Sequence, residues 1–241
     1  MLKKKIYVHQ KIPYAFNWNI VHHKAKLVES DPNREEFRSL GSYFKKVFQG
    51  AIPNDLFNLR GLPRVSQFKI RGLKPAFMAS FSKSLIREGI IKLHGPGSRL
   101  PKHVNDVFEN YKTSDIRKKP GHEPILKNIL IKDKNSVAIE IPIWKKINND
   151  HITGHIDLIQ IENGVIKVID YKPEGNFLFS LPQVATYGLF IESKFSLHDI
   201  KCISFNRNGA WEYDPHILLT DVKNYLISQR IIERKWEEFL Q

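Results

Sequence analysis

Residues 154–172 read GHIDLIQIENGVIKVIDYK, and this stretch decides the fold of the chain around it. Asn163 and Gly164 lie between two apolar runs rich in β-branched residues, which is the strongest short-range signal for a β-hairpin closed by a type I′ turn. With these two residues as the loop, Glu162 pairs with Val165. The stretch therefore predicts two adjacent antiparallel strands with a fixed register.

This register places charged side chains opposite one another. Counting outward from the turn pairs Asp157 with Asp170, and His155 with Lys172, and the alternation of side chains along a strand puts all four on one face. Two facing carboxylates among apolar neighbours repel each other and are costly to bury. A divalent cation would remove that cost, because Mg²⁺ and Mn²⁺ prefer hard oxygen ligands. We therefore expect a metal site here, the alternative being a solvated ribbon in which Lys172 forms a local ion pair.

The chain around the hairpin predicts an α/β fold. Residues 137–144, 154–161, 165–171 and 200–207 have the composition of strands, and Asn208-Gly209 follows as a turn. Residues 182–195 and 220–240 have the spacing of helices, the second being amphipathic. Strands that alternate with helices in this way predict a mixed central β-sheet flanked by helices.

The first 120 residues are expected to form a basic, mainly helical region, and residues 121–241 the core domain. Residues 32–51 carry apolar side chains at helical spacing and predict a helix that packs on the core. Residues 52–120 begin with an irregular segment rich in Pro, Gly, Arg and Lys and continue with a helix near 76–88, a short strand at 89–93 and a helix at 102–116. We interpret residues 52–120 as a candidate DNA-binding insertion.

The bulk composition narrows the class of protein. The chain has 241 residues, 41% of them hydrophobic, and a formal net charge of +13, which favours polyanionic partners. Cys202 is the single cysteine, which excludes an internal disulfide and any zinc site built from several cysteines. No apolar run in the sequence is long enough to span a bilayer, and residues 6–13 are too mixed for the apolar core of a signal peptide. We therefore expect a cytoplasmic protein with no membrane partner.

Three motifs together resemble the RecB-like branch of the PD-(D/E)XK nuclease superfamily. They are Gly-x-x-Asp at residues 154–157, Ile-Asp-Tyr-Lys at residues 169–172 and Gln-x-x-x-Tyr at residues 183–187. The resemblance covers about residues 136–195. It implies a restriction-endonuclease-like core, a Mg²⁺ cofactor that Mn²⁺ can replace, and hydrolysis of phosphodiester bonds in DNA, with single-stranded or duplex ends as the substrate of an exonuclease.

The resemblance also implies roles for individual residues. Asp157 and Asp170 would hold the metal together with the backbone carbonyl of Tyr171, and Lys172 would orient the attacking water. Gln183 and Tyr187 lie one turn apart on one helix face and would contact DNA or support the site. For Tyr187, packing in the core is the alternative.

Three further side chains are candidates for the site. Glu140 is a carboxylate in an otherwise apolar strand, so we expect it to join the catalytic group, the alternative being a buried salt bridge. His122 lies in a presumed loop before the first core strand and is a candidate metal ligand, although a single histidine in a loop is more often a surface residue. His155, across from Lys172 in the predicted register, is expected near the phosphate of bound DNA.

Two other functions stay open at this point. Members of the RecB-like branch often carry a metal-binding histidine after a Leu-Gly pair, and Lys45 stands at that place after Leu40-Gly41. This departure keeps open a catalytically weak or inactive DNA-binding protein on a nuclease fold. The basic segment 60–120 keeps open a sequence-specific or structure-specific endonuclease that reads bases.

Overall fold

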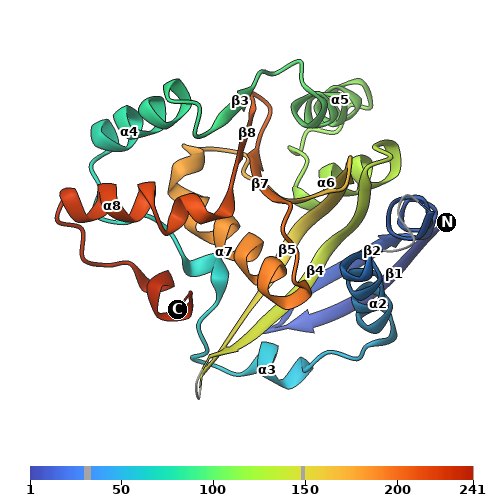
Figure 1. Cartoon of the computed structure of the whole chain (residues 1–241). Helices are drawn as coiled ribbons and strands as arrows, with labels where there is room; N and C mark the ends of the chain where they lie inside the picture. Colours follow the sequence, from blue (N-terminus) through green and yellow to red (C-terminus); the bar gives the residue numbers. More distant parts are fainter. Residues whose placement is uncertain (30–33, 148–149, 241) are drawn as a thin grey trace.

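A single eight-stranded sheet organises the protein (Figure 1). The structure is a computed structural model and describes residues 1–29, 34–147 and 150–240. The strand order is β1-β2-β4-β5-β6-β7-β8-β3; β6 and β7 are parallel and the other neighbouring pairs are antiparallel. The strands are β1 (Leu2–His9), β2 (Ile12–Asn19), β3 (Lys92–His94), β4 (Ser136–Ile147), β5 (Asp150–Glu162), β6 (Val165–Tyr171), β7 (Ile200–Phe205) and β8 (Ala210–Tyr213). The α/β fold with a mixed central sheet is confirmed.

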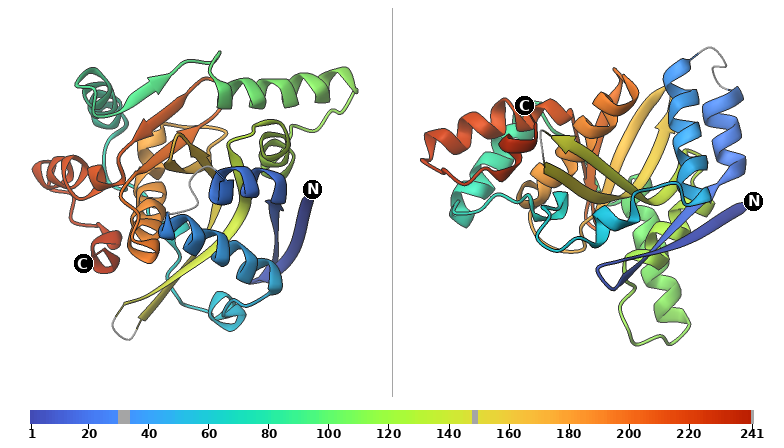
Figure 2. Two further views of the ribbon diagram at one scale, coloured as in Figure 1. Left: turned by 45° about the vertical axis from the view of Figure 1, so that its right-hand side comes forward. Right: turned by 90° about the horizontal axis from the view of Figure 1, so that it is seen from below.

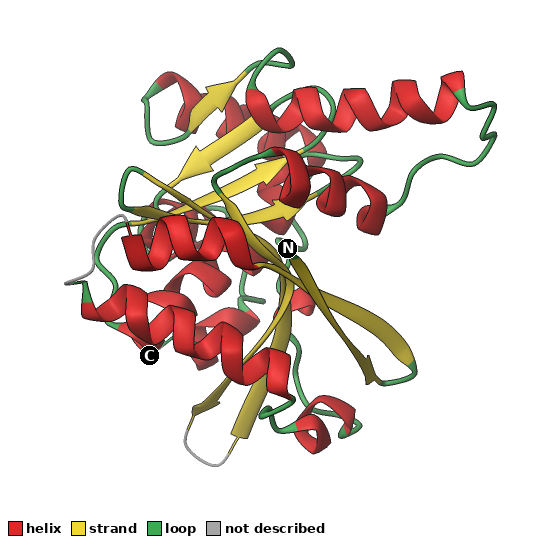
Figure 3. Ribbon diagram, turned by 90° about the vertical axis from the view of Figure 1, so that its right-hand side faces the viewer, coloured by secondary structure: helices red, strands yellow, loops and turns green. Residues whose placement is uncertain are grey.

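Helices cover both faces of the sheet (Figure 3). The larger apolar core lies under α2 (Glu35–Gln49), α4 (Pro75–Arg87), α7 (Phe177–Phe195) and α8 (Asp221–Ser228). The smaller core lies on the opposite face, under α5 (Arg99–Thr113) and α6 (His122–Lys132). The short elements are α1 (Ile20–His23), η1 (Lys24–Glu29), α3 (Asn54–Asn58), η2 (Val65–Gln67), η3 (Pro215–Leu218) and η4 (Lys235–Phe239). None of the described helices is long and apolar enough to cross a membrane.

The central hairpin has the predicted turn and register. Asn163 and Gly164 have φ angles of 52° and 80°, as a type I′ turn requires, and Glu162 pairs with Val165. The β5–β6 ladder ends at Leu158–Ile169, one pair short of the two aspartates. The predicted cross-strand pairs of Asp157 with Asp170 and of His155 with Lys172 do not form as part of it.

The first 120 residues contribute more to the sheet than expected. They supply β1 and β2, which were not expected, at one edge, and β3, near the short strand expected at residues 89–93, at the other. A boundary at residue 120 therefore does not separate the sheet from the region before it (Figure 2). The hairpin of β1 and β2 turns at Gln10 and Lys11, which have φ angles of 50° and 67°. Neither residue is a usual occupant of that conformation, and three lysines in β1 disfavour a strand by propensity. The sequence therefore gave no hairpin signal there.

The predicted helices differ from the observed ones mainly at their ends. The predicted helix 32–51 is α2, which ends at Gly50 with a φ of 88°, while the first residues of the prediction lie outside the described part of the chain. Helix α7 begins at Phe177 rather than residue 182, because the side chain of Asn176 accepts the Leu178 amide and caps the helix earlier.

The predicted C-terminal helix over residues 220–240 is wrong. Helix α8 ends at Ser228, and Arg230 follows with a φ of 58°. The Ile231 amide bonds back to the Leu226 carbonyl at 2.9 Å, which closes the helix as a left-handed cap does. Beyond it, η4 buries Trp236 and Phe239 against the main core, so the apolar residues that suggested one long helix belong to two separate elements.

Candidate active site

Two aspartates lie where the β5–β6 ladder ends. Asp157 Oδ2 accepts the backbone N–H of Tyr171 at 2.9 Å, so this carboxylate is held beside the residue that follows Asp170. Asp170 is 1% exposed, in the last part of β6. The two aspartates therefore stay neighbours, although a side-chain bond to the backbone replaces the predicted ladder pair.

Lys172 and Gln183 complete a closed set of contacts around Asp170. Lys172 Nζ lies 2.5 Å from Asp170 Oδ2, and it donates to Gln183 Oε1 at 3.3 Å. Gln183 Nε2, from α7, donates to Asp170 Oδ1 at 3.3 Å. The Lys172–Asp170 contact is a short ion pair, so this buried carboxylate is held by one cation and by the Gln183 amide. Gln183, predicted to contact DNA or support the site, positions both charged groups.

Glu140 joins the carboxylates from β4. It lies between two residues paired with β5, at Ile139–Leu158 and Ile141–Ile156, and is therefore opposite Asp157. Its φ of 53° is unusual for a glutamate, and at this point β4 changes face: Ile139 packs under α6, whereas Ile141 packs on the side of α7. A strained residue of this kind within a strand is typical of functional sites.

Burial and mutual repulsion disfavour a negative charge on all three carboxylates at once. Burial, followed by the charges of Asp157 and Asp170, raises the pKa of Glu140. Burial and Asp157 also raise the pKa of Asp170, against the lowering effect of Lys172. For Lys172, burial lowers the pKa, but the charges of Asp170 and Asp157 outweigh it and the net shift is upward. The carboxylates are thus short of positive charge, and Lys172 is held protonated.

We expect Glu140→Gln to stabilise the metal-free protein at alkaline pH. Burial raises the pKa of Glu140 from 4.5 to about 8, so the folded protein keeps this proton to higher pH than the unfolded chain does. The resulting stability is complete below pH 4.5 and is lost as the pH rises toward about 8. Urea unfolding in EDTA at pH 5 and pH 9 measures it: the variant should lose less stability between the two. Exposed Glu109→Gln is the matched control, and an equal loss in all three proteins would contradict the assignment.

His122 is placed by α6 rather than by a loop. It is the first residue of that helix, with Nδ1 3.7 Å from Asp157 Oδ2 and its ring edge-on to Tyr171. The contact with Asp157 raises the pKa of His122, because the neighbouring carboxylate favours the charged imidazole. The structure places this candidate metal ligand beside Asp157, whereas its predicted location in a loop is wrong.

Tyr187 supports the site from the core. Its side chain is 1% exposed and its hydroxyl accepts the backbone N–H of His155 at 3.2 Å. A Cβ atom built on Gly154 would lie 2.5 Å from Tyr187 Cε1, so only glycine fits where the ring crosses β5. The Gly-x-x-Asp and Gln-x-x-x-Tyr motifs are therefore in direct contact, which fixes α7 against the strand that carries Asp157.

His155 does not lie beside Lys172, and this prediction is wrong. Its ring stacks on Tyr14 at 3.7 Å between centroids, and its Nε2 lies 2.9 Å from His9 Nδ1. Tyr14 and His9 belong to the N-terminal hairpin, whose docking against β4 and β5 the sequence did not predict. His155 is therefore part of the buried contact between that hairpin and the sheet.

The donor set fits a divalent cation that is only partly enclosed by protein. Among the described residues, no three His, Cys, Asp or Glu side chains converge as a complete ligand set. Asp157 and Asp170 still offer hard oxygen atoms next to the backbone of Tyr171. Mg²⁺ is commonly held by one or two carboxylates, with water and substrate phosphate as its other ligands.

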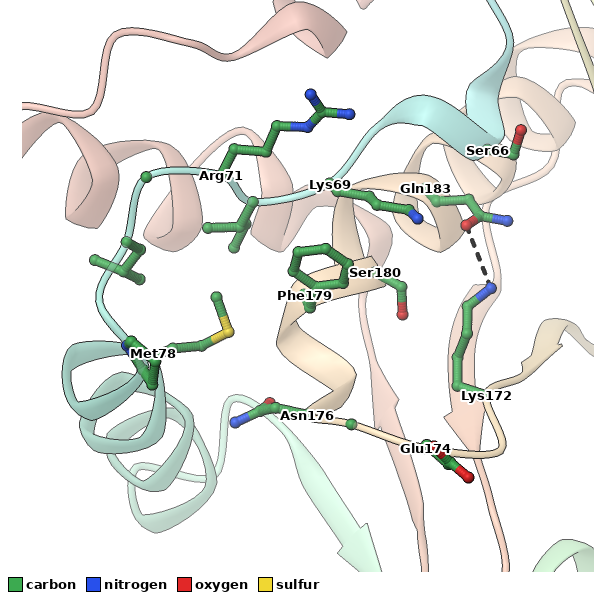
Figure 4. Close-up of a pocket in the computed structure, with 15 residues that line it drawn as sticks. Ser66, Lys69, Arg71, Met78, Lys172, Glu174, Asn176, Phe179, Ser180 and Gln183 are labelled. Atoms are coloured by element: carbon green, nitrogen blue, oxygen red, sulfur yellow. Dashed lines mark hydrogen bonds between the residues drawn. The ribbon is translucent and has the colours of Figure 1, made fainter.

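A cavity of about 880 Å³ opens beside Lys172 (Figure 4). One wall is the segment of residues 66–78, and the other is formed by residues 174–183 at the start of α7. The sequence marks residues 52–75 as basic and irregular, but it does not predict that Lys69, Arg71 and Phe179 line the same cavity as Lys172. Lys45, at the position where RecB-like enzymes often carry a histidine, lines a different pocket with Trp18 and His23.

No protein-family model matches the chain, and comparison with curated proteins gives no match.

Proposed function

We propose that the protein is a Mg²⁺-dependent DNA nuclease of the PD-(D/E)XK type that acts as a RecB-like exonuclease, with Mn²⁺ able to replace Mg²⁺. The single observation that carries the proposal is the environment of Asp170. This aspartate is buried, is opposed by two other carboxylates, and has Lys172 as its ion-pair partner. Structural ion pairs seldom gather an excess of buried negative charge, whereas metal-dependent hydrolytic sites require it.

Each residue has a task in the proposed reaction. Asp157 and Asp170 would hold the cation, with the Tyr171 carbonyl as a further ligand; the cation would neutralise phosphate charge and acidify a water molecule. Lys172, kept protonated by the aspartates, would orient the attacking water and stabilise negative charge on the phosphate. Gln183 would fix Lys172 relative to Asp170, and Glu140 would add negative charge beside Asp157.

Cleavage assays on three DNA substrates test the proposal. Purified protein is incubated with end-labelled single-stranded DNA, linear duplex and a closed circle, with Mg²⁺, Mn²⁺ or EDTA. We expect short products from the linear substrates with either metal, an intact circle, and no cleavage in EDTA. Cutting of the circle would favour the endonuclease alternative. Binding of all three substrates without cleavage would contradict the nuclease and favour a DNA-binding protein.

A further inference from the structure

The cavity beside Lys172 has two kinds of wall. Ile70, Leu73, Met78 and Phe179 give it an apolar part, and Lys69, Arg71 and Lys172 give it a cationic part. Glu174 is the carboxylate among the lining residues. Its volume of about 880 Å³ is within the range of ligand sites. A surface that combines apolar and cationic groups in this way matches a ligand with flat apolar rings and negative charges.

Phe179 lies at the centre of this surface. It is 41% exposed although it belongs to α7, most of whose side chains are buried. Lys69 Nζ lies 5.4 Å from the centre of its ring, and in Figure 4 Lys69 extends above the ring toward Gln183. An exposed aromatic ring with a cation beside it is a platform on which a nucleobase stacks while its phosphate meets the cation.

The opposite wall is held in place by the backbone. The Ile70 N–H donates to the Phe179 carbonyl at 3.1 Å, and Phe68 and Ile70 on either side of Lys69 are buried. Lys69 and Arg71 thus project from an anchored segment, and in the described part of the chain neither forms an ion pair with a carboxylate. Their charges are available to a ligand.

We propose that this cavity binds an unpaired segment of the DNA strand, with one base stacked on Phe179 and its phosphates at Lys69 and Arg71, and that it leads the strand to Lys172. The delivery of the strand for cleavage rests on the proposed nuclease function, whereas the binding of the strand in the cavity does not. A single strand fits better than a duplex, because paired bases hide their faces within the stack and leave Phe179 without a partner. The substrate class is therefore single-stranded DNA or a frayed end.

Binding in the absence of metal tests the proposal separately from cleavage. Fluorescence anisotropy in EDTA measures the affinity for labelled oligo-dT and for a blunt hairpin duplex. Wild type should prefer oligo-dT, and Phe179→Ala should weaken that binding at least about fivefold with little effect on the duplex. Phe179→Trp should retain the affinity. Phe77→Ala is the matched control, since Phe77 is 45% exposed on α4 but does not line the cavity.

A second variant tests the proposal if Phe179→Ala does not fold. Lys69→Gln combined with Arg71→Gln changes only side chains on the anchored segment and should lower the salt dependence of oligo-dT binding by about one phosphate contact for each residue. Unchanged affinity and salt dependence would contradict the proposal that this cavity binds single-stranded DNA. An equal loss of affinity in Phe77→Ala would contradict it as well. If wild type binds oligo-dT through Phe179 but cleaves no DNA, the proposed nuclease function is contradicted and the proposed binding site is not.

Discussion

Asp170→Asn is expected to lower the rate of DNA cleavage by at least about a thousandfold while the protein stays folded and still binds DNA. The change keeps the size of a buried side chain, but it removes the charge that would hold the cation and that pairs with Lys172. Single-turnover cleavage of labelled single-stranded DNA at saturating Mg²⁺ measures the effect. Anisotropy in EDTA measures binding on the same preparations.

Asp199→Asn is the matched control for this prediction. Asp199 precedes β7, where its carbonyl accepts the Ile166 amide at the far end of β6, so the variant removes the same charge away from the site. We expect its cleavage rate to stay within about twofold of wild type. A similar fall in both variants would point to net charge rather than to the carboxylate. Loss of DNA binding with unchanged cleavage of each bound complex would contradict the role of Asp170.

Gly154→Ala is expected to lower the free energy of unfolding by about 2 kcal/mol. The new Cβ would lie 2.5 Å from Cε1 and 2.7 Å from the hydroxyl oxygen of Tyr187. Tyr187 is buried against the core on α7, so its ring cannot turn away without opening that packing. Urea unfolding monitored by circular dichroism measures the change.

Two comparisons separate this contact from a general effect of adding a methyl group. Gly97→Ala is the matched control, because nothing lies within 4 Å of the Cβ that it would add. In a Tyr187→Leu background, Gly154→Ala should cost much less, since the ring atoms that it meets are gone. Equal costs in the two backgrounds would show that the Gly154–Tyr187 contact does not connect the two motifs.

The local signals of the sequence were sufficient for the central hairpin. Asn163-Gly164 fixed both the turn and the register, because its type I′ geometry allows few alternatives once β-branched strands flank it. The expectation that Glu140 joins the aspartates followed from the cost of burying its charge, and the structure places it opposite Asp157. These features depend on neighbours in sequence or on the cost of burying a charge.

The features that were missed depend on contacts distant in sequence. The turn at Gln10 and Lys11 has no usual turn residue, so the sequence did not predict the hairpin of β1 and β2. The docking of that hairpin brings Tyr14 onto His155. Alternation along a strand also fails at the site itself, because Glu140 adopts a left-handed conformation and Asp157 bonds to the Tyr171 amide instead of extending the ladder. The departure from regular sheet geometry lies where the carboxylates gather.

The most direct measurement is an anomalous difference map from crystals of the protein soaked in Mn²⁺. The account predicts a strong peak adjacent to the carboxylates of both Asp157 and Asp170, and no such peak in crystals of Asp170→Asn soaked in the same way. A wild-type map that shows Mn²⁺ peaks at other places in the crystal but no peak between these two side chains would contradict it.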